Sequence, residues 1–435
     1  MRINGTTHLK IKVKEFGIEE LNLRSAKQKS EFIYSLKLDK EKRIPWFKFI
    51  TNLKIFNPDA QFKFEEAVDK YFVHLDTGLN LKPTFECGTQ TGLSINYELL
   101  SSVRELNRDI LIGSKKETFD LFYDIGRRSS FISRYIEGTL GALPNGLVEE
   151  LPILHTSFNQ FIARTGRLSS TNPNMQNWPR TAKFSIKQAI TPRFRDGSIA
   201  KGDSSQIEIR ALGAYYNSEL LKEDYRKGID IHANAARIAF GPGFTDEQRN
   251  IVKSAIVFRS IYWGSAGAIV RDPSVPFSDI KEVQRIIDGL LNRYPEWRDG
   301  REEDLAFVKK NGYLDVWMTG FRFYFQDLYN AYKWHYSLKN KVANYPIQHI
   351  AACLLYLAMI FCFLKFKELK LKSLLIGTVH DEIVCDVYPG EEEIVSVVLK
   401  DALTTGTIEL FKKYFGIDFN FPLDCSVKIL PSWGG

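Results

Sequence analysis

The most apolar stretch of the sequence, residues 350–364, places the strongest limit on how this 435-residue chain folds. A membrane span needs about 20 apolar residues in a row, and this stretch has only 15. We therefore expect a buried core helix over residues 349–366, and no membrane association.

Two further segments combine an apolar pattern with a polar end. Residues 373–387 are apolar on both sides of a polar tip at His380, Asp381 and Glu382, which predicts a hairpin with these residues at or near its turn. Residues 198–212 predict a short strand that passes into a helix. Residues 230–262 predict two helices divided by a Gly-Pro-Gly sequence, and Thr245 is a suitable N-cap for the second.

Composition bounds the class of protein. Hydrophobic residues make up 44% and charged residues 26%, which excludes a disordered or fibrous chain. The length predicts two or three cores. A net charge of +7 permits a polyanionic partner without requiring one. The five cysteines are widely spaced with no CxxC pair, which excludes a zinc ribbon and indicates a reduced, intracellular protein.

Two acidic sites could hold a cation. Asp203 ends an apolar strand, and the pair Asp381 and Glu382 lies at the predicted hairpin tip. Carboxylates brought together from distant strand ends suit Mg²⁺, which keeps waters and takes phosphate oxygens. The alternative, which spacing by itself favours, is that these acids are solvated turn residues.

Two other patterns could bind a nucleotide or nucleic acid. Arg249 and Lys253 lie four residues apart on one helical face, as do Phe258 and Tyr262 after them. Cations on one face can contact a triphosphate and an aromatic can stack on a base, although a solvated face and core aromatics are the plainer interpretation. The polar residues 163–179 could bind sugars, phosphates and minor-groove acceptors, or form only a surface loop.

Taken together and in order, five blocks resemble the family A DNA polymerases over roughly residues 85–435. The blocks are Thr165-Gly-Arg-Leu-Ser-Ser with Pro173-Asn-Met-Gln-Asn-Trp-Pro179 (primer-template block), Asp203-Ser-Ser-Gln-Ile-Glu-Ile-Arg210 (motif A), Asp230-Ile-His-Ala-Asn-Ala-Ala236 with Arg249-Asn-Ile-Val-Lys253 (fingers and motif B), Asn344-Tyr-Pro-Ile-Gln348 (before the long helix) and Val379-His-Asp-Glu-Ile-Val384 (motif C).

The resemblance implies an α+β, right-hand polymerase fold with an antiparallel palm sheet, helical fingers and a helical thumb. The expected division is an N-terminal palm edge or extension (1–30), the thumb (31–160, with 46–86 as an insertion), the palm with motif A (161–212), the fingers with motif B (213–343) and the palm with motif C (344–435). Residues 46–86 either enlarge the thumb, which we favour, or dock a processivity or replication partner.

The resemblance also implies 5′-to-3′ addition of deoxynucleotides (dNTPs) to a primer on a DNA template, with two Mg²⁺ ions for which Mn²⁺ can substitute. The expected catalytic residues are Asp203, Asp381 and Glu382, and the metal ligands are Asp203, the backbone carbonyl of Ser204 and Asp381. The expected nucleotide-binding residues are Gln206, Glu208, His232, Arg249, Lys253, Phe258 and Tyr262, with Glu208 as the steric gate against a 2′-hydroxyl. The expected primer-template contacts are Arg167, Asn174, Asn177, Gln348 and His380.

The sequence departs from the family pattern in motif B. The family places aromatics four and eight residues after the lysine, whereas Phe258 and Tyr262 come one residue later. One extra residue rotates a regular helix by about 100°. We therefore expect a π-bulge that restores the face. The glycine expected after Gln348 is His349.

About 160 residues precede the primer-template block, which predicts a thumb but neither a proofreading exonuclease nor a 5′-nuclease. A single-subunit RNA polymerase is the nearest enzyme alternative, and Glu208 and the primer-template block argue against it. A catalytically impaired relative that only binds primer-template is the other alternative. The acids and cations named above argue against it, but the altered motif B leaves it open.

Overall fold

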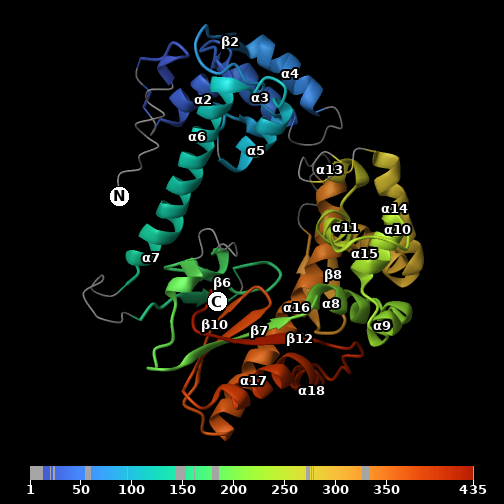
Figure 1. Cartoon of the computed structure of the whole chain (residues 1–435). Coiled ribbons are helices and arrows are strands. Elements are labelled where there is room, and N and C mark those ends of the chain that lie inside the picture. The colour runs from blue at the N-terminus through green and yellow to red at the C-terminus, as the bar shows by residue number, and fades with distance from the viewer. Residues whose placement is uncertain are drawn as a thin grey trace. The chain divides into compact units, whose positions relative to one another are not determined.

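The computed structural model describes residues 13–19, 21–22, 25–53, 60–95, 97–143, 153–160, 162–178, 186–270, 275, 277, 279–325 and 334–434. The chain divides into two compact units, Met1–Arg134 and Tyr135–Gly435 (Figure 1). Each unit has a hydrophobic core of its own.

The first unit is mainly helical. Its helices are α2 (Ala26–Tyr34), α3 (Arg43–Leu53), α4 (Ala60–Tyr71), α5 (Tyr97–Leu106) and α6 (Gly113–Phe131). Its strands form two short antiparallel pairs, β1 (Leu36–Leu38) with β2 (Phe72–His74) and β3 (Gly88–Thr89) with β4 (Gly92–Leu93).

Trp46 on α3 lies at the centre of this core, where it is fully buried and its indole N–H donates to the Thr89 carbonyl at 2.8 Å. The helix α4 and most of α3 lie inside residues 46–86, where the sequence shows no clear period. The reason is that Ile44, Phe47 and Phe62 are exposed, at 69%, 45% and 64%. Apolar residues on the solvent side obscure the 3.6-residue repeat.

The second unit is built on one antiparallel sheet with strand order β10-β11-β7-β12. The strands are β7 (Ser198–Ser204), β10 (Leu374–Val379), β11 (Glu382–Val387) and β12 (Cys425–Leu430). Two further antiparallel pairs are β5 (Ser157–Asn159) with β6 (Ser169–Thr171) and β8 (Tyr313–Val316) with β9 (Phe321–Tyr324). Mixed helices and antiparallel sheet confirm the α+β prediction.

The helices of this unit follow in chain order. They are α7 (Gly138–Leu140), α8 (Ile207–Tyr215), α9 (Glu219–Arg226), α10 (Ile231–Phe240), α11 (Asp246–Val252), α12 (Phe258–Ile261), α13 (Ala266–Val270), α14 (Ile280–Arg293), α15 (Pro295–Asn311), α16 (Trp334–Glu368), α17 (Glu392–Asp401) and α18 (Thr407–Phe415). Short π-helices cover Lys253–Val257 and Ala402–Gly406, and a third, Ile132–Glu137, spans the boundary between the two units.

The two faces of the main sheet carry different residues. Ala200 and Ile383 lie on the face that packs against α16 and α17. Ile199 and Val384 lie on the opposite face, in a cluster with Trp178 and Trp433. Because side chains alternate along a strand, Asp203 and Glu382 share this second face. The sheet therefore presents its acidic residues on the side away from α16.

The helix α16 begins 15 residues before the predicted start at residue 349, so that boundary is wrong. The predicted Asn344–Gln348 block before the helix lies inside it, with Pro346 as an internal residue. Proline normally marks a helix boundary because it removes an N–H donor. Here Val342 and Ile347 are fully buried on either side of it, so tertiary packing overrides the local signal.

Residues 338–368 of α16 are long and apolar enough to cross a membrane by length and composition, and the most apolar 18-residue window within them has a mean hydropathy of 2.1. However, 56% of the most apolar window is buried within the protein, and α16 packs against α8, α15 and α18. Burial of this kind is typical of a core helix, as the sequence predicts.

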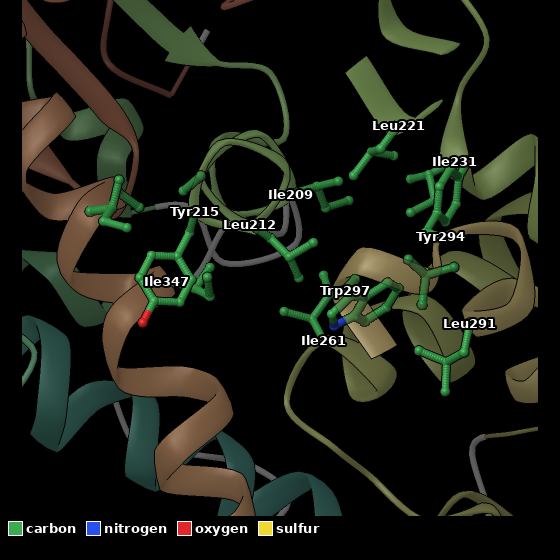
Figure 2. Packing of buried hydrophobic residues seen from close by; sticks show 14 of the residues in the cluster. Ile209, Leu212, Tyr215, Leu221, Ile231, Ile261, Leu291, Tyr294, Trp297 and Ile347 are labelled. Atoms are coloured by element: carbon green, nitrogen blue, oxygen red, sulfur yellow. The ribbon is translucent and has the colours of Figure 1, made fainter. Parts of the chain in front are cut away.

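The helices α8 to α15 pack around a second core, drawn in Figure 2. Ile209 and Leu212 of α8 meet Leu221, Ile231 and Ile261 from the following helices, together with Leu291, Tyr294 and Trp297. This core attaches the helical region to α8, which directly follows β7.

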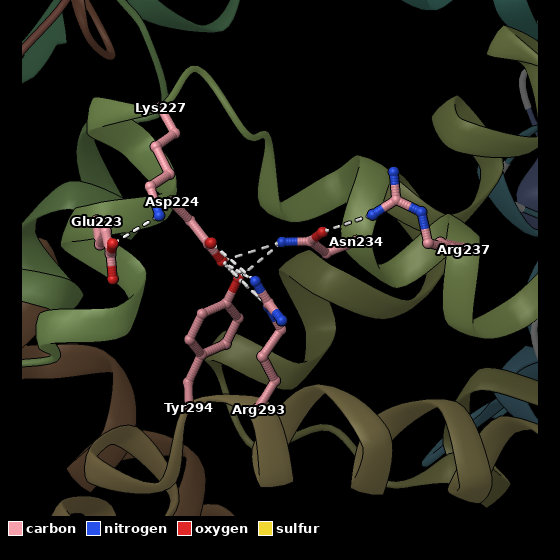
Figure 3. A network of polar contacts seen from close by, with 7 residues as sticks. All are labelled: Glu223, Asp224, Lys227, Asn234, Arg237, Arg293 and Tyr294. Atoms are coloured by element: carbon pink, nitrogen blue, oxygen red, sulfur yellow. Dashed lines mark hydrogen bonds and ion pairs between the residues drawn. The ribbon is translucent and has the colours of Figure 1, made fainter. Parts of the chain in front are cut away.

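A buried polar network braces the same region (Figure 3). The carboxylate of Asp224, on α9, accepts hydrogen bonds from Arg293 at 2.7 Å and from the Tyr294 hydroxyl at 2.7 Å. Asn234 of α10 donates to both Asp224 and Tyr294. The network therefore fixes α10 between α9 and α14.

Candidate active site

The two predicted acidic sites meet at the end of β7. Asp203 pairs with Glu382 across β7 and β11, while His380 and Asp381 form the two-residue turn between β10 and β11. The Ser204 N–H donates to the Asp381 carbonyl at 3.2 Å. The hairpin prediction is confirmed, and residues separated by about 180 positions in the sequence become neighbours.

Glu382 has partners of its own. Its carboxylate accepts a 2.7 Å hydrogen bond from the Trp433 indole, and the Lys187 and Lys201 ammonium groups lie 3.8 and 3.7 Å away. This hydrogen bond and the two nearby cations hold the Glu382 carboxylate in place at the end of β7.

The donor set suits Mg²⁺. Among the described residues, no group of three or more His, Cys, Asp or Glu side chains could hold an ion by itself. A pair of aspartates with a backbone carbonyl is a small donor set, and Mg²⁺ usually completes its shell with waters and substrate phosphates.

The motif B segment contains the expected bulge. Thr245 and Gln248 form a capping box at the start of α11, and residues Lys253–Val257 form a π-helix before α12 resumes. The Phe258 ring lies 5.6 Å from the His232 ring and 6.0 Å from the Lys253 ammonium. The wider turn accommodates the extra residue, so Phe258 stays next to Lys253 and His232.

Asp230 joins the cations to motif A. It is the N-cap of α10, where its side chain accepts from the His232 N–H at 3.0 Å. The Arg249 guanidinium donates to the same carboxylate through two of its nitrogens, and Gln206 donates at 3.4 Å. Four of the predicted nucleotide-binding residues (Gln206, His232, Arg249 and Lys253) are thereby gathered around the start of α10 and the end of α11.

His232 is a buried side chain with unused hydrogen-bonding capacity. The residue is fully buried, and neither ring nitrogen has a hydrogen-bond partner in the described residues. The pKa of His232 is lowered to about 4, mainly by burial, with smaller lowering effects from Lys253 and Arg249 and an opposing effect from Asp230. An anionic group placed beside Lys253 and Arg249 would offer this ring the acceptor it lacks.

Glu208 links three of the predicted segments. Arg167 donates to one oxygen of its carboxylate, and the Tyr262 hydroxyl donates to the other. The carboxylate therefore joins the primer-template block, motif A and the end of motif B.

A cavity of about 280 Å³ adjoins these residues. Its lining includes Arg167, Asn174, Asn177, His380 and Asp381, so most of the predicted primer-template residues do come together beside a metal-ligand candidate. Gln348 is half-buried on α16 and is not part of that lining.

Several residues of this region are not among the site residues predicted from the five sequence blocks. Lys187, Lys201 and Trp433 surround Glu382, and His349 and Tyr356 contact the turn before Arg167. The last two carry a weak signal, because they are polar groups seven residues apart on one face of an otherwise apolar helix.

Comparison with known proteins gives a consistent result. The sequence model described as DNA polymerase family A matches residues 73–435. DNA polymerase I of Chloroflexus aurantiacus is 31% identical over 69% of this chain and 30% of its own length, and that of Bacillus subtilis is 28% identical over 79% of this chain and 37% of its own. The chain thus spans about a third of the length of these curated relatives.

A solved structure shares the fold. The POL domain of Pol1 from M. smegmatis, in complex with DNA primer-template and dNTP, aligns with a TM-score of 0.66 and 23% identity. The alignment covers 95% of this chain and 69% of that one. The likeness supports the right-hand architecture expected from the sequence.

Proposed function

Because the chain belongs to DNA polymerase family A, we propose that it extends the 3′ end of a DNA primer with deoxynucleoside triphosphates, copying a DNA template. The observation that carries this proposal is the meeting of Asp203 and Asp381 beside the cavity lined by Arg167, Asn174 and Asn177.

In this proposal Asp203, Asp381 and the Ser204 carbonyl hold two Mg²⁺ ions, for which Mn²⁺ can substitute. Such ions, when bound, stabilise the charge that develops on the attacking and leaving oxygens of nucleotidyl transfer. Glu382 serves as the auxiliary acid near the primer end, and its contacts with Lys187, Lys201 and Trp433 hold its carboxylate in place.

The incoming nucleotide contacts the motif B side of the site. Arg249, Lys253 and His232 bind the triphosphate, and Phe258 stacks on the base. Gln206 supports this pocket through its bond to Asp230. Glu208, held by Arg167 and Tyr262, fills the space that a ribose 2′-hydroxyl would need.

Primer and template lie against Arg167, Asn174, Asn177, His380 and Gln348. The five-part division into palm, thumb and fingers and the intracellular location stay predictions of the sequence. The same holds for a processivity or replication partner at residues 46–86, of which 54–59 lie outside the described residues.

Primer extension with Mg²⁺ tests the proposal. Wild-type protein and Asp381→Ala are each given a primed DNA template with the four deoxynucleotides, and ribonucleotides are tested in parallel. We expect extension by deoxynucleotides only, lost in the variant. Efficient ribonucleotide polymerisation would favour an RNA polymerase, and tight primer-template binding without extension would favour an impaired relative.

A further inference from the structure

His349 occupies an unusual place on α16. The side chain is buried, with 7% of the residue exposed, and its ring lies 4.5 Å from the Phe321 ring and 5.7 Å from the Phe323 ring. Both nitrogens have partners. Nδ1 is 3.2 Å from the Thr165 carbonyl oxygen, and Nε2 is 3.1 Å from the Thr319 hydroxyl.

These partners select one form of the ring. A carbonyl oxygen can only accept, so Nδ1 carries the proton and donates to Thr165, while Nε2 accepts from the Thr319 hydroxyl. Burial lowers the pKa of His349, which favours the same neutral ring. A single tautomer thus satisfies both contacts.

The contact with Thr165 lies at the turn that precedes Arg167. Gly166 has a left-handed backbone with φ of 79°, and a Cβ there would lie 3.3 Å from His349 Nδ1. The next carbonyl, that of Gly166, accepts a 2.5 Å hydrogen bond from the Tyr356 hydroxyl. Two side chains of α16 therefore hold consecutive carbonyls of this turn, and Arg167 leaves the turn to reach Glu208.

We propose that His349 is a positioning residue that fixes the Thr165–Arg167 turn, so that Arg167 holds Glu208 against the sugar of the incoming nucleotide. The inference rests on the proposed function, because it assigns His349 a share in sugar discrimination. The hydrogen bond from Nδ1 is the essential contact, and the Thr319 bond orients the ring.

Two amide substitutions separate positioning from packing. The Asn amide of His349→Asn can replace the Nδ1 donor, whereas the longer His349→Gln places its amide near the Nε2 position. Both remove the ring, so a purely structural role would affect the two variants alike. His349→Leu removes both bonds.

The measured quantity is the ratio of kcat/KM for deoxynucleotide to kcat/KM for ribonucleotide in primer extension. We expect His349→Leu and His349→Gln to lower this ratio roughly fivefold, as loss of one neutral hydrogen bond typically does. His349→Asn should stay close to wild type. Equal ratios in the Asn and Gln variants, or no change in any of the three, would overturn the proposal.

A double-mutant cycle separates this proposal from the polymerase assignment. The unfolding free energy is measured for wild type, His349→Leu, Arg167→Ala and the double variant, all in the full chain. Coupling between the two sites is expected, because they act through one turn. If wild type extends no primer, the polymerase assignment fails. Whatever the result of that assay, additive effects in the cycle would refute the role of His349.

Discussion

The Tyr262 hydroxyl donates a hydrogen bond to the Glu208 carboxylate, so the last turn of motif B is tied to the first turn of α8. Arg167 donates to the other oxygen of the same group. The position of Glu208 therefore depends on two segments that lie before and after it in the sequence.

Replacement of Glu208 tests its proposed role as the steric gate. Glu208→Ala removes the bulk that excludes a 2′-hydroxyl. We therefore expect ribonucleotide incorporation to rise about tenfold or more relative to deoxynucleotide incorporation. Glu208→Gln keeps the bulk and an acceptor for Tyr262, so its ratio should change less. Single-nucleotide incorporation assays measure both, and an unchanged ratio in Glu208→Ala would exclude the gate.

The π-helix at Lys253–Val257 predicts an asymmetric response to deletion. Removing Ser254, which is exposed, should convert the wide turn into regular helix and keep Phe258 and Tyr262 on their present face. Removing Ser260, within the regular turn of α12, should rotate Tyr262 by about 100° away from Glu208.

Thermal unfolding and primer extension report on these two deletions. The Ser254 deletion is expected to fold and extend primers, and the Ser260 deletion to lose extension. Equal loss in both would contradict the interpretation of the π-helix as an absorbed extra residue.

The buried network at Asp224 predicts a large stability effect. Asp224→Ala leaves the Arg293 guanidinium and the Tyr294 hydroxyl without their shared acceptor, and we expect a loss of about 3–5 kcal/mol in the free energy of unfolding. The exposed pair Lys227 and Glu223, also drawn in Figure 3, is the matched control. Glu223→Ala should cost less than about 1 kcal/mol in the same urea titration.

His232 predicts a pH dependence of stability. Its pKa in the folded protein is about 4, below the ordinary histidine value, so the unfolded chain binds the proton more readily. Stability from this group is therefore complete above about pH 6.5 and decreases as pH falls toward 4, by roughly 3 kcal/mol in total.

The difference between wild type and His232→Gln isolates this contribution from other titrating groups. The unfolding free energies of both proteins are measured from pH 4 to pH 7. As the pH rises over this range, the stability of wild type relative to the variant should increase. Parallel curves would show that His232 is not held neutral by the fold.

The sequence predicts the elements around the sheet well, because their signals are local. The strand at residues 198–204, the polar tip at His380 and Asp381, and the Thr245 cap all depend on neighbouring residues. The start of α16 is predicted wrongly because packing of Val342 and Ile347 outweighs Pro346. The helix α3 is not predicted, because its exposed apolar residues Ile44 and Phe47 obscure the 3.6-residue helical repeat.

The candidate site also has parts that the sequence predicts and parts that it does not. Motif spacing predicts Asp203 and Asp381 as site residues and correctly places the bulge after Lys253. The partners of Glu382, by contrast, come from residues 187, 201 and 433. Similarly, His349 appears in the sequence only as a departure from glycine, while its contacts with Thr165 and Thr319 depend on the tertiary fold. Long-range polar contacts of this kind leave no pattern in the sequence.

The central claim is that Asp203 and Asp381 act together as metal ligands, and single-turnover incorporation of one deoxynucleotide with Mg²⁺ tests it most directly. Asp203→Asn and Asp381→Asn keep the side-chain size and remove the charge, so primer-template binding should persist in both. We predict that each lowers the rate of incorporation roughly a hundredfold or more. Incorporation at the wild-type rate in either variant, with binding intact, would contradict the account.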